Sequence, residues 1–145
     1  MKFTIATVGR PRDRAIAQAI DDYEQRAARY WPIESVEVRA GGGIEREGVR
    51  LADAVGDSRI IICEPGGTSR TSEEFARWLQ DLRERAAHVA FVIGGAFGID
   101  KALTSRASSR LSLAPWTLPH EMARLVLAEQ MYRAGTILKG EPYHK

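Results

Sequence analysis

Two short, uninterrupted apolar runs constrain the fold of this chain more than any other sequence feature. Residues 59–63 read Arg-Ile-Ile-Ile-Cys and residues 89–93 read Val-Ala-Phe-Val-Ile. Strands buried on both faces of a parallel sheet have such continuous apolar sequences, whereas half-exposed strands alternate. Because segments with apolar residues at helical spacing lie before, between and after these runs, strand and helix alternate about five times along the chain. The sequence therefore predicts an α/β domain with a mostly parallel sheet and helices on both faces.

The bounds of the expected elements follow from apolar spacing and from residues that begin or end regular structure. Pro32 ends the first helix because the residue before a proline is pushed out of the α region, and Thr71 with Glu74 has the capping-box spacing. No repeat or linker is evident, so we expect residues 1–145 to form a single domain. The predicted strands are residues 3–8, 33–38, 59–63, 89–93 and 110–113, and the predicted helices are residues 16–30, 44–55, 71–86, 99–107 and a long one that Pro119 begins.

Composition excludes several classes of protein. The chain has no apolar run near the ~20 residues that a membrane span needs, and its first residues lack the features of a signal peptide. Cys63 is its one cysteine, which excludes an intramolecular disulfide and predicts a reduced, cytoplasmic setting. The net charge is +2, but residues 101–145 hold 7 basic and only 3 acidic side chains. This basic third could contact a polyanion, or it could be an ordinary solvated surface.

Common catalytic motifs are absent. Residues 94–98 do not match G-x-G-x-x-G, no Gly-Lys-Ser/Thr exists for a phosphate-binding loop, and no Gly-x-Ser-x-Gly elbow is present. His120 and Glu121 begin like H-E-x-x-H, but Arg124 stands where the second histidine is needed. We therefore expect no metal site.

Three predicted loops lie where a ligand would bind. Residues 64–70, 94–98 and 114–118 follow strands, and ligands of parallel sheets bind beyond the carboxyl ends of the strands. Glycines in residues 94–98 would let the main chain approach a ligand closely, or they would only make a tight strand-to-helix turn. The apolar residues available to line a pocket for an adenine ring are Leu113, Pro115, Trp116 and Leu118.

Four segments resemble one known family. Residues 91–98 (Phe-Val-Ile-Gly-Gly-Ala-Phe-Gly), 116–120 (Trp-Thr-Leu-Pro-His), 127–134 (Leu-Ala-Glu-Gln-Met-Tyr-Arg-Ala) and 142–145 (Pro-Tyr-His-Lys) are similar to the RlmH family. The resemblance implies a SPOUT-class methyltransferase that uses S-adenosyl-L-methionine to methylate N3 of a pseudouridine in large-subunit (23S) ribosomal RNA of assembled ribosomes. It also implies a five-stranded parallel sheet, a C-terminal trefoil knot that holds the cofactor, and a homodimer.

The implied reaction suggests roles for residues near the C-terminus, and the resemblance itself supplies the cofactor positions. His144 is expected to accept a proton or contact RNA, Arg133 to contact a phosphate or the imide, and Tyr143 to belong to a tail that reaches the partner's pocket. Cys63 stands where the family often has leucine, so we interpret it as a small buried contact and not as a nucleophile. The expected cofactor-binding residues are Cys63, Gly95, Leu113, Ala114, Pro115, Trp116, Thr117 and Leu118.

Other interpretations stay open at this point. The long last helix has apolar residues on more than one face, such as Met122, Leu125 and Val126, which fits a dimer or a large monomeric core. The chain could also be a SPOUT methyltransferase that acts on tRNA, although it lacks an added RNA-binding domain. A non-catalytic ribosome-associated binding protein is a third possibility, which would show no saturable site for S-adenosylmethionine.

Overall fold

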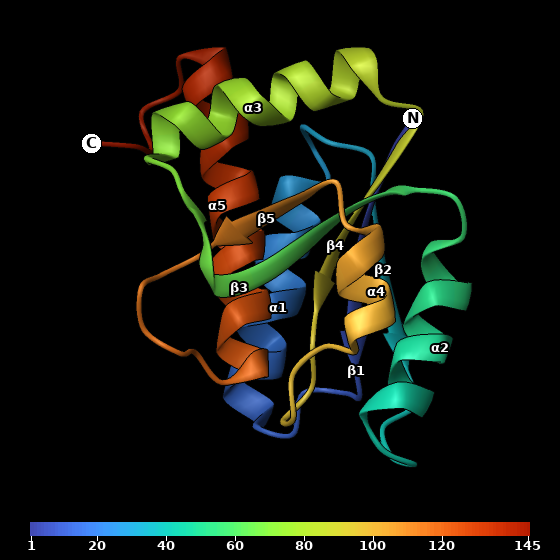
Figure 1. The fold of residues 1–145 in the computed structure, drawn as a ribbon. Helices are drawn as coiled ribbons and strands as arrows, with labels where there is room; N and C mark the ends of the chain where they lie inside the picture. Colours follow the sequence, from blue (N-terminus) through green and yellow to red (C-terminus); the bar gives the residue numbers. More distant parts are fainter.

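A computed structural model describes residues 1–145 and contains one five-stranded sheet (Figure 1). The strand order is β2-β1-β4-β3-β5, and all four neighbouring pairs are parallel. The predicted α/β architecture with a parallel sheet is therefore confirmed. The elements in chain order are β1 (Lys2–Val8), α1 (Arg14–Ala27), β2 (Ile33–Val38), α2 (Ile44–Val55), β3 (Arg59–Ser69), α3 (Ser72–Arg85), β4 (His88–Ile93), α4 (Lys101–Arg106), β5 (Ser109–Ser112) and α5 (His120–Lys139).

Helices cover both faces of the sheet because successive strand residues point to opposite sides. On β4, Phe91 belongs to the core that packs against α1, α3 and α5, whereas Val92 belongs to the core under α2 and α4. Figure 1 shows α2 and α4 on one side of the sheet, with α1 and α5 on the other. The central strands are thus buried on both faces, which explains the uninterrupted apolar runs.

β3 is longer than the sequence predicts. Residues 64–70 were expected to form a loop, but β3 continues to Ser69. Cys63 and Thr68 both pair with Leu111 of β5, so the residues between them form a bulge and the strand then resumes. The extension carries few apolar side chains, which is why its sequence resembles a loop. A Cβ on Gly67 would lie only 2.7 Å from the Leu111 carbonyl carbon, so this residue lets the two strands approach closely.

The ends of the helices follow local signals in the sequence. The capping box before α3 is complete, because the Thr71 side chain accepts from the Glu74 N–H and the Glu74 side chain accepts from the Thr71 N–H. Pro119 precedes α5 as its N-cap and is not its first helical residue. No helix combines the length and apolar character needed to cross a membrane.

An ion triad around the buried Arg124 fixes α5 against α1 and β2. Arg124 donates from Nε to Glu24 Oε2 at 2.9 Å and from Nη1 to Glu37 Oε2 at 2.6 Å. The Arg124 side chain is only 9% exposed. Since α5 also contributes to the cavity described next, the triad helps to set the position of one cavity wall.

Candidate functional site

A cavity of about 600 Å³ lies at the edge of the sheet where the strands end. The bulge of β3 and the segments after β4 and β5 meet there, close to the edge that the carboxyl-end rule predicts, and the first turn of α5 closes one side. The cavity volume is typical of small-molecule sites. Every residue expected to contact a cofactor lines this cavity except Pro115, and the lining residues are Cys63, Glu64, Pro65, Ile93, Gly94, Gly95, Ala96, Gly98, Ile99, Thr104, Leu113, Ala114, Trp116, Thr117, Leu118, Pro119, His120 and Ala123.

The cavity wall is mainly apolar side chain and main chain. Its one carboxylate, Glu64, is paired with Arg110 across a 3.1 Å contact. Beyond it, the ionisable lining residues are Cys63 and His120. A wall of this kind suits a ligand that is recognised by stacking, apolar contact and main-chain hydrogen bonds.

The turn after β4 is compact and needs glycine. A Cβ on Gly94 would lie 2.6 Å from the Gly98 carbonyl oxygen and 2.6 Å from Ile99 Cγ1. Gly98 has a φ of +92°, a conformation that side chains disfavour. Gly95 is less crowded, since a Cβ there would lie 3.3 Å from the Cβ of Val8. The tight-turn interpretation is confirmed, and it is compatible with the ligand-binding interpretation, which stays a prediction, because the same glycines line the cavity.

Cys63 lies in the cavity wall and packs against the core. Burial raises the pKa of its thiol to about 12. The thiolate is the nucleophilic form of cysteine, so this thiol stays protonated and unreactive near neutral pH. The side chain acts as a small apolar contact, and its role toward a cofactor stays a prediction.

Two aromatic side chains stand exposed beside the cavity. Trp116 is 79% exposed although it lines the cavity, and Phe97, in the turn after β4, is 82% exposed. Single exposed apolar residues are common, but two large aromatics from neighbouring loops leave an uncovered apolar rim.

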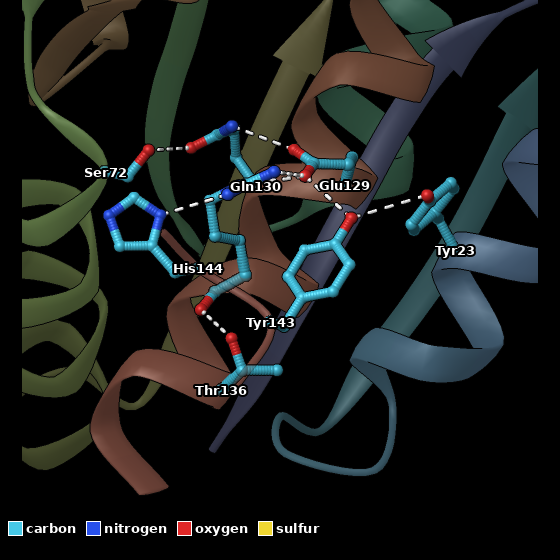
Figure 2. A network of polar contacts seen from close by, with 8 residues as sticks. Tyr23, Ser72, Glu129, Gln130, Thr136, Tyr143 and His144 are labelled. Atoms are coloured by element: carbon cyan, nitrogen blue, oxygen red, sulfur yellow. Dashed lines mark hydrogen bonds and ion pairs between the residues drawn. The ribbon is translucent and has the colours of Figure 1, made fainter. Parts of the chain in front are cut away.

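The three residues predicted to carry catalysis, Arg133, Tyr143 and His144, lie together with Glu129 in a C-terminal cluster (Figure 2). Arg133 donates from Nη2 to Glu129 Oε1 at 2.6 Å, and its Nη1 lies 3.0 Å from His144 Nδ1. The Tyr143 hydroxyl donates to the same Glu129 oxygen at 3.1 Å. The other ring nitrogen of His144, Nε2, is 2.7 Å from Glu73 on α3. The C-terminal tail is thus held against α5 and α3.

The protonation states in this C-terminal cluster follow from its contacts. Desolvation and then a hydrogen bond with Tyr23 raise the pKa of the Tyr143 phenol, so it stays protonated and donates. The hydrogen bond to Glu129 raises the pKa of Arg133, which stays cationic. Because a guanidinium only donates, His144 Nδ1 accepts from Arg133 and Nε2 donates to Glu73. That hydrogen bond lowers the pKa of Glu73.

The C-terminal cluster does not line the cavity of its own chain. Ala123 is the last cavity residue on α5, and Glu129 lies six residues further along, about 9 Å at the rise of an α-helix. The expectation that the tail acts in a partner's pocket is compatible with this separation and stays a prediction.

Some residues of the two sites were missed from the sequence. Thr104 reaches the cavity from α4, and no sequence signal marks it. Glu129, which contacts both Arg133 and Tyr143, could have been found because acidic and basic residues four apart on a helix pair readily. Glu73 could not have been found from the sequence, because its contact with His144 joins residues 71 positions apart.

Comparison with known proteins shows the family to which this chain belongs. A family model described as "Predicted SPOUT methyltransferase" matches residues 1–144. A protein from Gemmatimonas aurantiaca named "Ribosomal RNA large subunit methyltransferase H" is 54% identical over 154 residues, covering all of both chains. The chain belongs to the RlmH family of SPOUT methyltransferases. Another relative with the same name, from Anaeromyxobacter dehalogenans, is 41% identical over 153 residues and also covers both chains fully.

Solved structures support the fold of this RlmH-family protein. The tRNA (m1G37) methyltransferase from Aquifex aeolicus superposes with a TM-score of 0.56 at 14% identity, covering all of this chain and 75% of that one. A probable methylase family protein from Haemophilus influenzae gives a TM-score of 0.60 at 13% identity, covering 99% and 70%. At these identities the likeness concerns the fold alone.

Proposed function

We propose that this RlmH-family protein transfers a methyl group from S-adenosyl-L-methionine to N3 of a pseudouridine in large-subunit ribosomal RNA. The observation that carries the proposal is the apolar, main-chain-walled cavity at the end of the sheet. The full-length relatives named for large-subunit ribosomal RNA supply the substrate class. We expect the protein to act on assembled ribosomes in the cytoplasm.

The cavity fits the proposed cofactor. Leu113 and Leu118 offer apolar surface for an adenine ring, and the loop between β5 and α5 offers main-chain groups to the ring edge. The turn after β4 has no side chain at Gly94 and Gly95, so its main chain can approach the ligand closely. We assign cofactor contacts to Cys63, Gly95 and residues 113–118.

The cofactor and the protein would supply different parts of the reaction. When bound, S-adenosylmethionine supplies a methyl group on a sulfonium centre that a nitrogen lone pair can attack. N3 of pseudouridine is an imide nitrogen that bears a proton, so the protein must remove that proton and exclude water. The residues that line the cavity would hold the donor and fix its orientation, and such positioning contributes much of the rate enhancement of a bimolecular reaction.

The C-terminal cluster suits the proton step. In the present conformation Arg133 occupies the lone pair of His144 Nδ1. We propose that Arg133 moves onto an imide oxygen or neighbouring phosphate, where its charge favours the deprotonated base. That movement frees Nδ1 to accept the N3 proton. The Tyr143 phenol, held protonated by its surroundings, positions the tail and does not act as the base.

A homodimer would complete the site. The cluster lies outside its own cavity, so we propose that the tail of one copy faces the cavity of the other. Half-buried apolar residues on α5, Met122, Leu125 and Val126, would lie in the interface, as would the exposed rim formed by Phe97 and Trp116. We further propose that the segment after β5 is threaded as a trefoil knot around the cofactor.

Transfer of labelled methyl groups tests the function. Purified protein is incubated with labelled S-adenosylmethionine and, separately, assembled ribosomes, protein-free ribosomal RNA and tRNA. We expect label only in the large-subunit RNA of ribosomes, and loss of labelling without loss of calorimetric donor binding when residues 143–145 are deleted. Labelling of tRNA, or the absence of any saturable donor site, would refute the proposal in favour of a tRNA methyltransferase or a binding protein.

A matched pair of variants separates the tail's chemistry from its folding. His144→Gln keeps hydrogen-bonding capacity but removes the proton acceptor, and we expect methylation to fall by about 100-fold or more. Lys139→Gln, at the exposed end of α5, removes a charge outside the cluster and should leave the rate unchanged. Equal rates in both variants would remove His144 from the mechanism.

A further inference from the structure

Three arginines follow β1 within a short stretch of chain. Arg10, Arg12 and Arg14 are all exposed, and none of their guanidinium groups makes a hydrogen bond or an ion pair within the chain. The two carboxylates beside them are both engaged by main-chain N–H groups. Asp13 accepts from Ile16 at 3.0 Å, and Glu121 accepts from Arg12. This segment, the arginine loop, therefore presents three cationic side chains without internal partners.

The positions of these arginines are unfavourable for stability. Arg14 is the first residue of α1, where the helix dipole favours negative charge, and the first turn of α1 contains no acidic residue. Arg10 and Arg12 add like charges next to it. The Asp13 N-cap offsets this conflict only in part, and local conflicts of this kind are concentrated at functional sites.

The arginine loop lies beside the mouth of the cavity. Thr7 at the end of β1 pairs with Ile93 at the end of β4, so the segments that follow them begin side by side. Arg12 N–H donates to Glu121 in the first turn of α5, and the adjacent His120 lines the cavity. Figure 1 shows the loop between β1 and α1 at the same end of the molecule as the start of α5.

We propose that the arginine loop binds backbone phosphates of the RNA next to the nucleotide to be methylated. This inference rests on the proposed function and names the part of the surface that holds the substrate. Guanidinium groups bind phosphate oxygens through paired N–H donors, and phosphate contacts fix the position and orientation of a nucleic acid without reading its sequence. The loop sets the depth at which the target base enters the cavity.

Two double variants of equal charge test the proposal. Arg10→Gln/Arg12→Gln removes two arginines from the loop. Arg29→Gln/Arg77→Gln removes two exposed arginines that also lack internal bonds, one beyond the far end of α1 and one on α3. Methylation kinetics on ribosomes are measured between about 50 and 200 mM salt, a range over which phosphate contacts weaken strongly. Fluorescence anisotropy on protein-free large-subunit RNA measures direct binding, and calorimetry measures donor binding.

The loop variant should raise KM for ribosomes by about tenfold, with kcat near wild type, and should lower the slope of log affinity against log salt by about 1.5. Donor affinity should not change, and the control variant should match wild type throughout. Equal KM values and slopes in the two double variants would overturn the proposal. A reduced slope on ribosomes but not on protein-free RNA would also overturn it, because a ribosomal protein would then be the partner.

The anisotropy measurement distinguishes a failure of this inference from a failure of the proposed function. If wild-type protein methylates no ribosomal RNA, the proposed function fails. RNA binding that the loop variant weakens, and the control variant does not, would still support the arginine loop. RNA binding that is equal in both variants would refute it.

Discussion

Replacing Gly94 with alanine tests whether the compact turn after β4 shapes the cavity. The added methyl would lie 2.6 Å from the Gly98 carbonyl oxygen, 2.6 Å from Ile99 Cγ1 and 2.7 Å from the Gly98 carbonyl carbon. Two of these three atoms belong to the main chain, so the contacts cannot be relieved by rotating a side chain. The turn must open, which moves main-chain atoms that line the cavity.

The expected size of the effect follows from this crowding. Overpacking of a well-packed site costs about 1–3 kcal/mol, which for a chain of this size lowers the midpoint of thermal unfolding by about 3–10 °C. We expect donor affinity to fall at least tenfold, equivalent to about 1.4 kcal/mol. Thermal unfolding and calorimetric titration with S-adenosylmethionine measure the two effects.

Two further alanine variants calibrate the measurement. Gly95→Ala meets only the Val8 side chain at 3.3 Å, so its effects should be much smaller than those of Gly94→Ala. Gly66→Ala places its methyl in open space and lies outside the cavity lining, so stability and affinity should be unchanged. If Gly94→Ala matched Gly66→Ala in both assays, the reasoning about the turn would be wrong.

Three other outcomes are expected. At pH 8 iodoacetamide should alkylate Cys63 at least ~100-fold more slowly than a free thiol, and mass spectrometry should show the rate still rising with pH toward the pKa of about 12. The stabilising contribution of its neutral form is complete below the ordinary pKa near 9 and is lost as pH rises through about 12. Arg124→Met leaves Glu24 and Glu37 unpaired and should cost about 1–3 kcal/mol in urea unfolding, because both carboxylates are partly accessible to water; no measurable loss would contradict a stabilising role of the triad. Thr71→Ala removes one half of the capping box and should cost about 1 kcal/mol in the same assay, whereas no loss would show that the cap is redundant.

The parts of the fold that could be predicted are those with a local physical signal. The runs 59–63 and 89–93 are apolar because both faces of their strands are buried, and the Thr71 capping box depends on contacts only three residues apart. Two of the loops that line the cavity, within residues 94–98 and 114–118, could be located because parallel strands end at one edge. Each of these signals is contained in a few neighbouring residues.

The features that could not be predicted depend on distant partners. The second half of β3 is a strand because β5 pairs with it, and its own residues resemble a loop. The contact between His144 and Glu73 joins the tail to α3 across 71 positions of the sequence. The placement of Thr104 in the cavity depends on how α4 packs against the sheet. Periodicity and motif spacing contain no information about such pairings.

The walls of the cavity are completed late in the synthesis of the chain. Every lining residue comes from positions 63–123, and the first turn of α5 supplies the last of them. A translating ribosome shields the most recently added residues of a growing chain, so the walls cannot be completed until residues 113–123 have left it. A growing chain therefore acquires its small-molecule cavity only after this turn has emerged, and a chain cut short before residue 113 never acquires it.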